Sequence, residues 1–269
     1  MRSQNTLAAR HLALLSRFVL LFASCVALPA QPQVGGGSCN SASLNGNYSL
    51  TLSGRDVAST ATLMKVSVGV GTATFDGLSK VTLTLTANTG KPPGTAETLS
   101  GTYSLQVNCI GTLTITSGDS ATFTLESYNQ GKAYLITGQD GTYAFSGSGN
   151  SLPATCPATE LNGTYAFNGN GFLVGTGAIS GVADFSGLMQ FNGASAVTST
   201  WYISSGGSTQ TVTSSGTYSI GSNCAGTASL TDSSGNSYSL QFTITSTVGN
   251  FIFGGASPQM AFTGTGRTL

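Results

Sequence analysis

Apolar and polar residues alternate with a period of two along most of the chain beyond residue 40. In the segment KVTLTLTAN, residues 80–88, Val81, Leu83 and Leu85 fall on one face and threonines on the other. Strict alternation predicts half-buried strands of an antiparallel sheet that has one face in water. The pattern recurs at Tyr48, Leu50 and Leu52; at Tyr103, Leu105 and Val107; at Leu113 and Ile115; at Phe123 and Leu125; and at Tyr143 and Phe145.

Turn signals separate these predicted strands. They are Asp76-Gly77, Asn88-Thr89-Gly90, Gly118-Asp119 and Asp140-Gly141, then Ser186-Gly187, Asn192-Gly193 and Ser234-Gly235. No stretch beyond the N-terminal region shows a helical period. The pattern predicts an all-β protein with about eight strands in each half, either a small up-and-down antiparallel barrel, which we favour, or a sandwich.

The chain also repeats itself. Four pairs of segments match in order: CNSASLNGNYSL from Cys39 with CPATELNGTYAF from Cys156, GTATFDGL from Gly71 with GVADFSGL from Gly181, GTYSLQVNCIGTLTIT from Gly101 with GTYSIGSNCAGTASLT from Gly216, and AFSGSG from Ala144 with AFTGTG from Ala261. A unit of roughly 115 residues has the size of a domain rather than of a solenoid turn. We therefore expect two tandem β-domains, residues 39–155 and 156–269.

Each repeat carries one cysteine at its start and one in an NC.GT segment. A duplication favours pairing within each unit, so we predict disulfides from Cys39 to Cys109 and from Cys156 to Cys224. Each bond would close a loop of about 70 residues and stabilise its domain by about 4 kcal/mol on the chain-entropy model. Neither pair has the CxxC spacing of a redox or zinc site, which favours a structural role.

The N-terminal region reads as a secretory signal. Arg2, Arg10 and Arg17 precede a short apolar run at residues 18–23, too short to span a bilayer as a helix. The following FASC resembles the lipobox of bacterial lipoproteins, which implies a signal peptide of residues 1–24 and lipid modification of Cys25. Ordinary signal-peptidase cleavage nearby, after Cys25 or Ala30, is the alternative. Residues 25–38 are rich in proline and then glycine, and as a coil this tether would reach roughly 20 Å.

Charge and histidine content narrow the chemistry. Charged residues make up 7% of the chain, against about 25% in typical domains. Removal of the signal leaves six basic and nine acidic residues, a net charge of −3, which argues against nucleic-acid binding. The single histidine, His11, lies in the signal, which excludes histidine-activated nucleophiles and histidine metal sites from the mature protein. A nucleophilic serine activated by lysine is the alternative that remains. The lysines of repeat one stand beside turns or at strand ends, where solvated charges are usual, at Lys65, Lys80, Lys91 and Lys132.

No pair of acids stands in a glycosidase-like motif, so we expect no catalytic residues, no cofactor and no metal. Two further features carry weaker signals. The segment DSSGNS from Asp232 resembles a short calcium loop, but a single carboxylate in a Ser-Gly-Asn context favours an ordinary hairpin. Trp201, beside Tyr202, could stack on a sugar, but it alternates with apolar neighbours near the position of Leu85, which favours the core.

The opening LNG.Y of each repeat, with the stapled first strand, resembles the calycin barrels of lipocalins and avidins. Those families carry Gly-x-Trp where this chain has Gly46-Asn47-Tyr48 and Gly163-Thr164-Tyr165, and Arg267 matches their terminal arginine in the second repeat only. Across the mature chain there is a closer similarity to secreted or lipid-anchored bacterial proteins of unknown function that repeat LNG.Y.F and NC.GTL modules. That resemblance implies a location and an architecture, and no activity.

These observations predict a non-enzymatic, extracytoplasmic protein of the cell envelope, a structural or interaction module held at the membrane by its lipid anchor or secreted. The alternative is a calycin-like binder of a small apolar ligand inside the barrel. A single transmembrane barrel of about 16 strands is a third possibility. The bulk of the inward side chains predicts that neither domain has a ligand-sized cavity.

Overall fold

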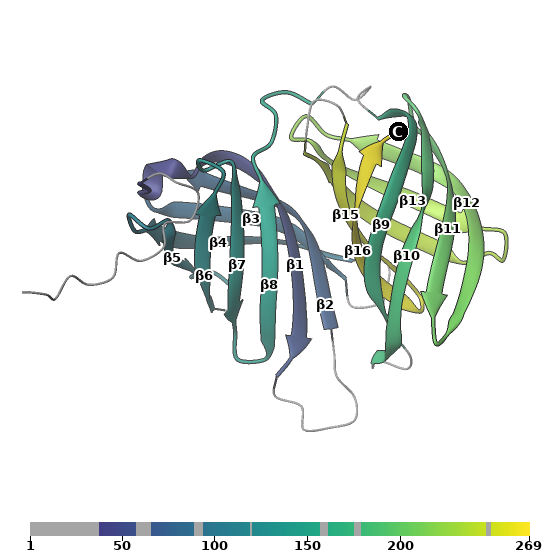
Figure 1. The fold of residues 1–269 in the computed structure, drawn as a ribbon, viewed down its shortest axis with the longest axis horizontal. Helices are drawn as coiled ribbons and strands as arrows, with labels where there is room; N and C mark the ends of the chain where they lie inside the picture. Colours follow the sequence, from purple (N-terminus) through teal and green to yellow (C-terminus); the bar gives the residue numbers. More distant parts are fainter. Residues whose placement is uncertain are drawn as a thin grey trace, which may run out of the picture. The chain divides into compact units, whose positions relative to one another are not determined.

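The computed structural model of the 269-residue chain describes residues 38–57, 66–88, 94–118, 120–156, 161–174, 179–245 and 249–269. Antiparallel strands close into two barrels of eight strands each, barrel one (β1–β8) and barrel two (β9–β16). Figure 1 shows the two barrels as ribbons. The predicted all-β class and the two tandem eight-stranded domains are confirmed, and the closed barrel is the architecture of each. A sandwich and a single barrel of 16 strands are both wrong.

Barrel one follows a simple up-and-down order. Each strand pairs with the next, and β1 pairs with β8 to close the sheet, with Thr51 opposite Ser148 and Asp56 opposite Tyr143. A short 3-10 helix, η1 (Ser41–Ser43), precedes the first strand. The strands are β1 (Asn45–Asp56), β2 (Val66–Asp76), β3 (Lys80–Asn88), β4 (Thr95–Leu105), β5 (Ile110–Ile115), β6 (Ala121–Tyr128), β7 (Ala133–Gln139) and β8 (Tyr143–Asn150).

Barrel two repeats this order, and β16 pairs with β9 to close it, with Phe262 opposite Gly171. Its strands are β9 (Asn162–Val174), β10 (Ile179–Asn192), β11 (Ala196–Ser205), β12 (Ser208–Ile220), β13 (Ala225–Asp232), β14 (Ser237–Ile244), β15 (Phe251–Ser257) and β16 (Met260–Thr268).

Alternation along each strand separates core from solvent. On β3, Val81, Leu83 and Leu85 are buried in the barrel, while Thr82 and Thr84 are exposed. Serine and threonine fill many of the outward positions on the other strands of barrel one, as in the rung of Thr84 between Thr72 and Thr98. A hydroxyl-rich exterior therefore takes the place that charged residues have on most domains.

One end of barrel one, which we call the closed end, is sealed by η1 and the residue that follows it. Leu44 is fully buried, and the Tyr103 hydroxyl lies 2.9 Å from the carbonyl oxygen of Ser41 and 2.8 Å from that of Leu44. The Tyr48 hydroxyl donates to the Gly131 carbonyl at 2.6 Å. Burial raises the pKa of Tyr103 to about 12, so this seal stays neutral and hydrogen-bonded at ordinary pH.

Barrel two is closed in the same way. The Tyr218 hydroxyl donates to the carbonyl of Leu161, which is fully buried like Leu44. At the centre of each seal lies one phenylalanine, and Phe75 meets three rings whereas Phe191 meets four. Phe75 lies 4.9 Å from Tyr103, and Phe191 lies 4.9 Å from Tyr218, both edge to face. The two repeats are therefore most similar in structure at the closed end of the barrel.

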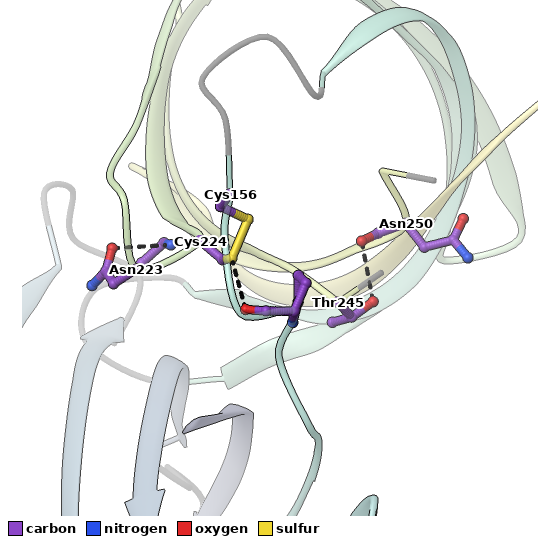
Figure 2. The surroundings of a disulfide bond; sticks show 7 residues. Cys156, Asn223, Cys224, Thr245 and Asn250 are labelled. Atoms are coloured by element: carbon purple, nitrogen blue, oxygen red, sulfur yellow. Dashed lines mark hydrogen bonds between the residues drawn. A yellow bond between two sulfur atoms is a disulfide. The ribbon is translucent and has the colours of Figure 1, made fainter. Parts of the chain in front are cut away.

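A disulfide ties the start of each unit to the turn before its fifth strand. The bonds join Cys39 to Cys109 and Cys156 to Cys224, as the repeat predicts. Figure 2 shows the second of these, with the neighbouring Asn223, whose side-chain oxygen accepts from the backbone N–H of Ala225. Cys109 and Cys224 both have a left-handed backbone, with φ of 66° and 64°. The two turns therefore share one conformation.

The strand register corrects one repeat match. Phe75 pairs with Gly46, and Phe191 pairs with Gly163, so the structural partner of Phe75 is Phe191 rather than Phe185. The matching segments are FDGLSKVTLT, residues 75–84, and FNGASAVTST, residues 191–200. The predicted turn at Ser186-Gly187 is also wrong, because both residues lie inside β10. The segments around Phe75 and Phe185 share a Phe-x-Gly sequence, which favoured the wrong match. The correct partner, Phe191, lies six residues further along the chain.

Several predictions concern residues outside the described ranges. They are the signal peptide, Cys25 and its lipid, nearly all of the tether, Lys65, Lys91, and the turn residues Thr89, Gly90 and Asp119. Within the described part of the chain, no helix is long and apolar enough to cross a membrane.

Candidate functional site: a pocket in barrel one

Barrel one contains a pocket of about 700 Å³ at the end opposite the closed end. All eight strands contribute to its lining, so it is the interior of the barrel and not a groove on its surface. The volume falls within the range of about 300–1,000 Å³ that small-molecule sites occupy. The prediction that neither domain has a ligand-sized cavity is therefore wrong for barrel one.

The pocket wall is apolar. Its inward side chains include Leu83, Leu85, Leu99, Phe123 and Ile136. Leu83, Leu85 and Phe123 are at most 5% exposed, whereas Leu99 is only half-buried, as expected where the barrel widens to its open end. Aliphatic and aromatic walls of this kind favour the burial of an apolar guest, at about 25 cal/mol for each Å² removed from water.

Polar groups stand at the mouth of the pocket. Glu97, Asp140 and Tyr143 lie in its lining, near the start of β4 and at the turn before β8. The Asp140 carboxylate accepts from the backbone N–H groups of Thr142 and Tyr143, both at 2.6 Å, which fixes this turn. Burial and the nearby carboxylates of Asp56 and Asp140 raise the pKa of Tyr143. The mouth therefore combines aromatic rings with carboxylates.

The same layer of barrel two is filled with rings. Register matching places Phe185 at the position of Gly69, Trp201 at that of Leu85 and Tyr238 at that of Ala121. Trp201 is 1% exposed. Its ring packs against Phe167 at 4.7 Å, Phe185 at 5.3 Å, Phe262 at 5.6 Å, Tyr238 at 6.0 Å and Phe253 at 6.3 Å.

Barrel two also replaces an apolar pair by a polar one. Leu83 and Leu99 face each other across β3 and β4, and the same rung of barrel two holds Ser199 and Ser214. Their hydroxyls lie 2.6 Å apart, and the Trp201 indole N–H donates to Ser199 Oγ at 2.6 Å. The small serines make room for the indole, and their hydroxyls satisfy its donor, so this interior is occupied by the protein's own side chains.

The remaining candidate residues from the sequence, Trp201 and Asp232, are engaged in packing or in holding a turn. Trp201 lies in the core, as predicted, and Tyr202 beside it is exposed on the outer face. Asp232 closes a hairpin turn: Oδ1 accepts from the N–H groups of Ser234 and Asn236, and Oδ2 accepts from the Asn236 amide and the Tyr238 hydroxyl. Both oxygens are thus occupied by donors of the hairpin itself.

Other groups remain scattered. Lys80 and Lys132 are exposed, each at the first or preceding residue of a strand. Among the described residues, no three His, Cys, Asp or Glu side chains gather where they could share a metal ion.

A second hollow, of about 640 Å³, lies over barrel two and is lined mainly by outward hydroxyls such as Thr198, Thr213 and Ser215. It lacks the apolar wall of the barrel-one pocket.

Sequence reasoning missed this pocket because it counted large inward side chains and passed over the small ones. Gly69 and Ala121 lie on the inward faces of β2 and β6, where barrel two has Phe185 and Tyr238. Small residues on the inward face of a small barrel are the signal that could have predicted the cavity. No family model and no curated protein matches this chain in sequence.

Proposed function

We propose that this is an extracytoplasmic, non-enzymatic binding protein that holds a small, largely apolar ligand inside barrel one. The observation that carries the proposal is the pocket of about 700 Å³ with its leucine and phenylalanine wall. Barrel two, filled by its own aromatic rings, serves as a companion domain. The structural or interaction role expected from the sequence becomes the better account if the pocket takes no guest.

The location of the protein is part of this proposal. Two disulfides are typical of proteins that fold in an oxidising compartment outside the cytoplasm. The basic and apolar N-terminal segment and the FASC motif support export and lipid modification of Cys25. Cys25→Ser should move the protein from the membrane fraction to the soluble fraction and leave both barrels folded. Unchanged membrane partitioning of the variant would contradict the anchor.

Ligand binding is tested with a neutral fluorescent probe, N-phenyl-1-naphthylamine, titrated into the purified protein. We expect one bound probe per chain, with enhanced fluorescence. Gly69→Phe and Ala121→Phe place rings where barrel two has Phe185 and Tyr238, and each should abolish binding. A Cβ at Gly69 would lie 3.1 Å from the tip of Leu85, a flexible side chain that can shift.

The matched control is Thr124→Phe, which adds the same ring to the exposed outer face of β6. It should bind the probe like the unaltered protein. Circular dichroism and the disulfide content show whether each variant is folded. Binding that survives both filling variants in folded protein, or no binding by the unaltered protein, would reject a binding role for barrel one.

A further inference from the structure

Glu97 lies in the lining of the barrel-one pocket, and its side chain is exposed at the mouth. It lies on the inward register of β4, opposite Leu85, and two residues from Leu99 on the same face. The matching position of barrel two, opposite Trp201, holds Val212. The Glu97 carboxylate makes no hydrogen bond or ion pair with another described residue. A carboxylate therefore stands at the mouth of an apolar pocket where the other repeat has an apolar side chain.

Two further carboxylates share this end of the barrel. Asp56 is the last residue of β1, on the inward register that also carries Leu52, and it pairs with Tyr143. Asp140 lines the pocket at the turn before β8. Among described residues the one cation near these groups in sequence is Arg55, which is exposed and stands on the opposite face of β1. The described part of the mouth is thus acidic.

Aromatic rings complete this mouth. Tyr143 and Phe145 both line the pocket, with ring centroids 5.7 Å apart, and Phe145 lies 6.2 Å from Phe123 deeper inside. The face of an aromatic ring attracts a cation within about 6 Å of its centroid. Carboxylates and rings at the mouth, with leucines below them, suit one ligand shape: a positive head attached to an apolar body.

We propose that the ligand of barrel one is a cationic amphiphile, an amine or quaternary ammonium compound whose apolar body fills the pocket and whose head lies beside Glu97. This inference rests on the proposed function. The apolar body supplies most of the affinity through burial. Glu97 selects for a positive head and against a carboxylate head, because opposite charges attract and like charges repel each other at the pocket mouth.

The test compares three ligands of one chain length: decyltrimethylammonium, decanol and decanoate. Each is titrated by calorimetry, the two ionic ligands below their micelle concentrations and decanol below its solubility limit. We expect the cation to bind one per chain, about fivefold more tightly than decanol, the gain typical of a partly exposed ion pair. Decanoate should bind more weakly than decanol. In Glu97→Val, which copies Val212, the preference for the cation over decanol should fall sharply.

Glu97→Gln keeps the size of the side chain and should behave like Glu97→Val. A Lys65→Gln/Lys91→Gln double variant tests the two lysines of the neighbouring connections, and it should keep the preference for the cation. If decanol and the cation bind equally to the unaltered protein, or if the preference survives in both Glu97 variants, the charge inference is overturned and the apolar site stands. If none of the three ligands binds, the proposed function fails as well.

Discussion

The two barrels are the same at one end and different at the other. At the closed end, Phe75 packs against Tyr48 and Tyr103, and Phe191 packs against the matching Tyr165 and Tyr218. Both units carry the same disulfide. At the open end of barrel one, Gly69 and Ala121 leave a pocket, whereas Phe185 and Tyr238 fill the same layer of barrel two. The comparison teaches that the closed end maintains the fold in both barrels. The side chains of one layer at the other end can then differ, and their size decides whether the interior is hollow.

The largest expected difference lies at one matched position. Trp201→Ala should destabilise barrel two by about 5 kcal/mol, because it removes a ring that five others contact. Leu85→Ala should cost barrel one about 2 kcal/mol, because Leu85 already borders a cavity. Hydrogen exchange measured by mass spectrometry reports the two barrels separately. Equal losses at the two positions would contradict the filled and hollow description.

Removing the disulfides, in contrast, should lower the free energy of unfolding of the two barrels by the same amount. The bonds close loops of nearly equal length, with sequence separations of 70 and 68 residues. Replacing Cys39 and Cys109 by alanine should therefore cost barrel one about 4 kcal/mol, and the Cys156/Cys224 pair should cost barrel two the same. Denaturant unfolding of the two double variants, again resolved by hydrogen exchange, measures this. A twofold difference between the losses in unfolding free energy of the two double variants would show that the closed ends are not equivalent.

The smallest effect concerns the turn after the second strand of each barrel. Asp76 Oδ1 accepts from the N–H groups of three residues, and Asn192 Oδ1 does the same in barrel two. The backbone hydrogen bond from Leu78, with those from its neighbours, holds the pKa of Asp76 below its ordinary value. Protonation would weaken these bonds, whereas the asparagine does not titrate.

Because the folded pKa of Asp76 is lowered, its contribution is present above the unfolded pKa and is lost as the pH falls through the folded value, from about pH 5 downward. Asp76→Asn should remove this part of the acid sensitivity of barrel one and keep the turn. Asn192→Asp should add the same sensitivity to barrel two. Melting temperatures between acidic and neutral pH measure both, and acid sensitivity unaffected by either exchange would reject the role of Asp76.

Much of the fold could be predicted from the sequence because period-two alternation and repetition are local signals. The strands around Leu83 and Leu85, the two disulfides and the core position of Trp201 follow from them. The pocket could not be predicted in the same way, because it depends on which side chains share one layer of a closed sheet. The strand register decides which side chains share that layer. Because the sequence comparison matched Phe75 to Phe185 instead of Phe191, it did not match Gly69 to Phe185, its structural counterpart.

The central claim is that barrel one is hollow and barrel two is filled. Methyl NMR of the protein saturated with N-phenyl-1-naphthylamine tests it most directly. Intermolecular contacts from the probe to assigned methyl groups show where it is bound. We predict contacts to Leu85, Leu99 and Ile136, which line the barrel-one pocket, and none to Leu230 or Leu240, which are buried in barrel two. Contacts to the methyl groups of barrel two, with none to those of barrel one, would contradict the account.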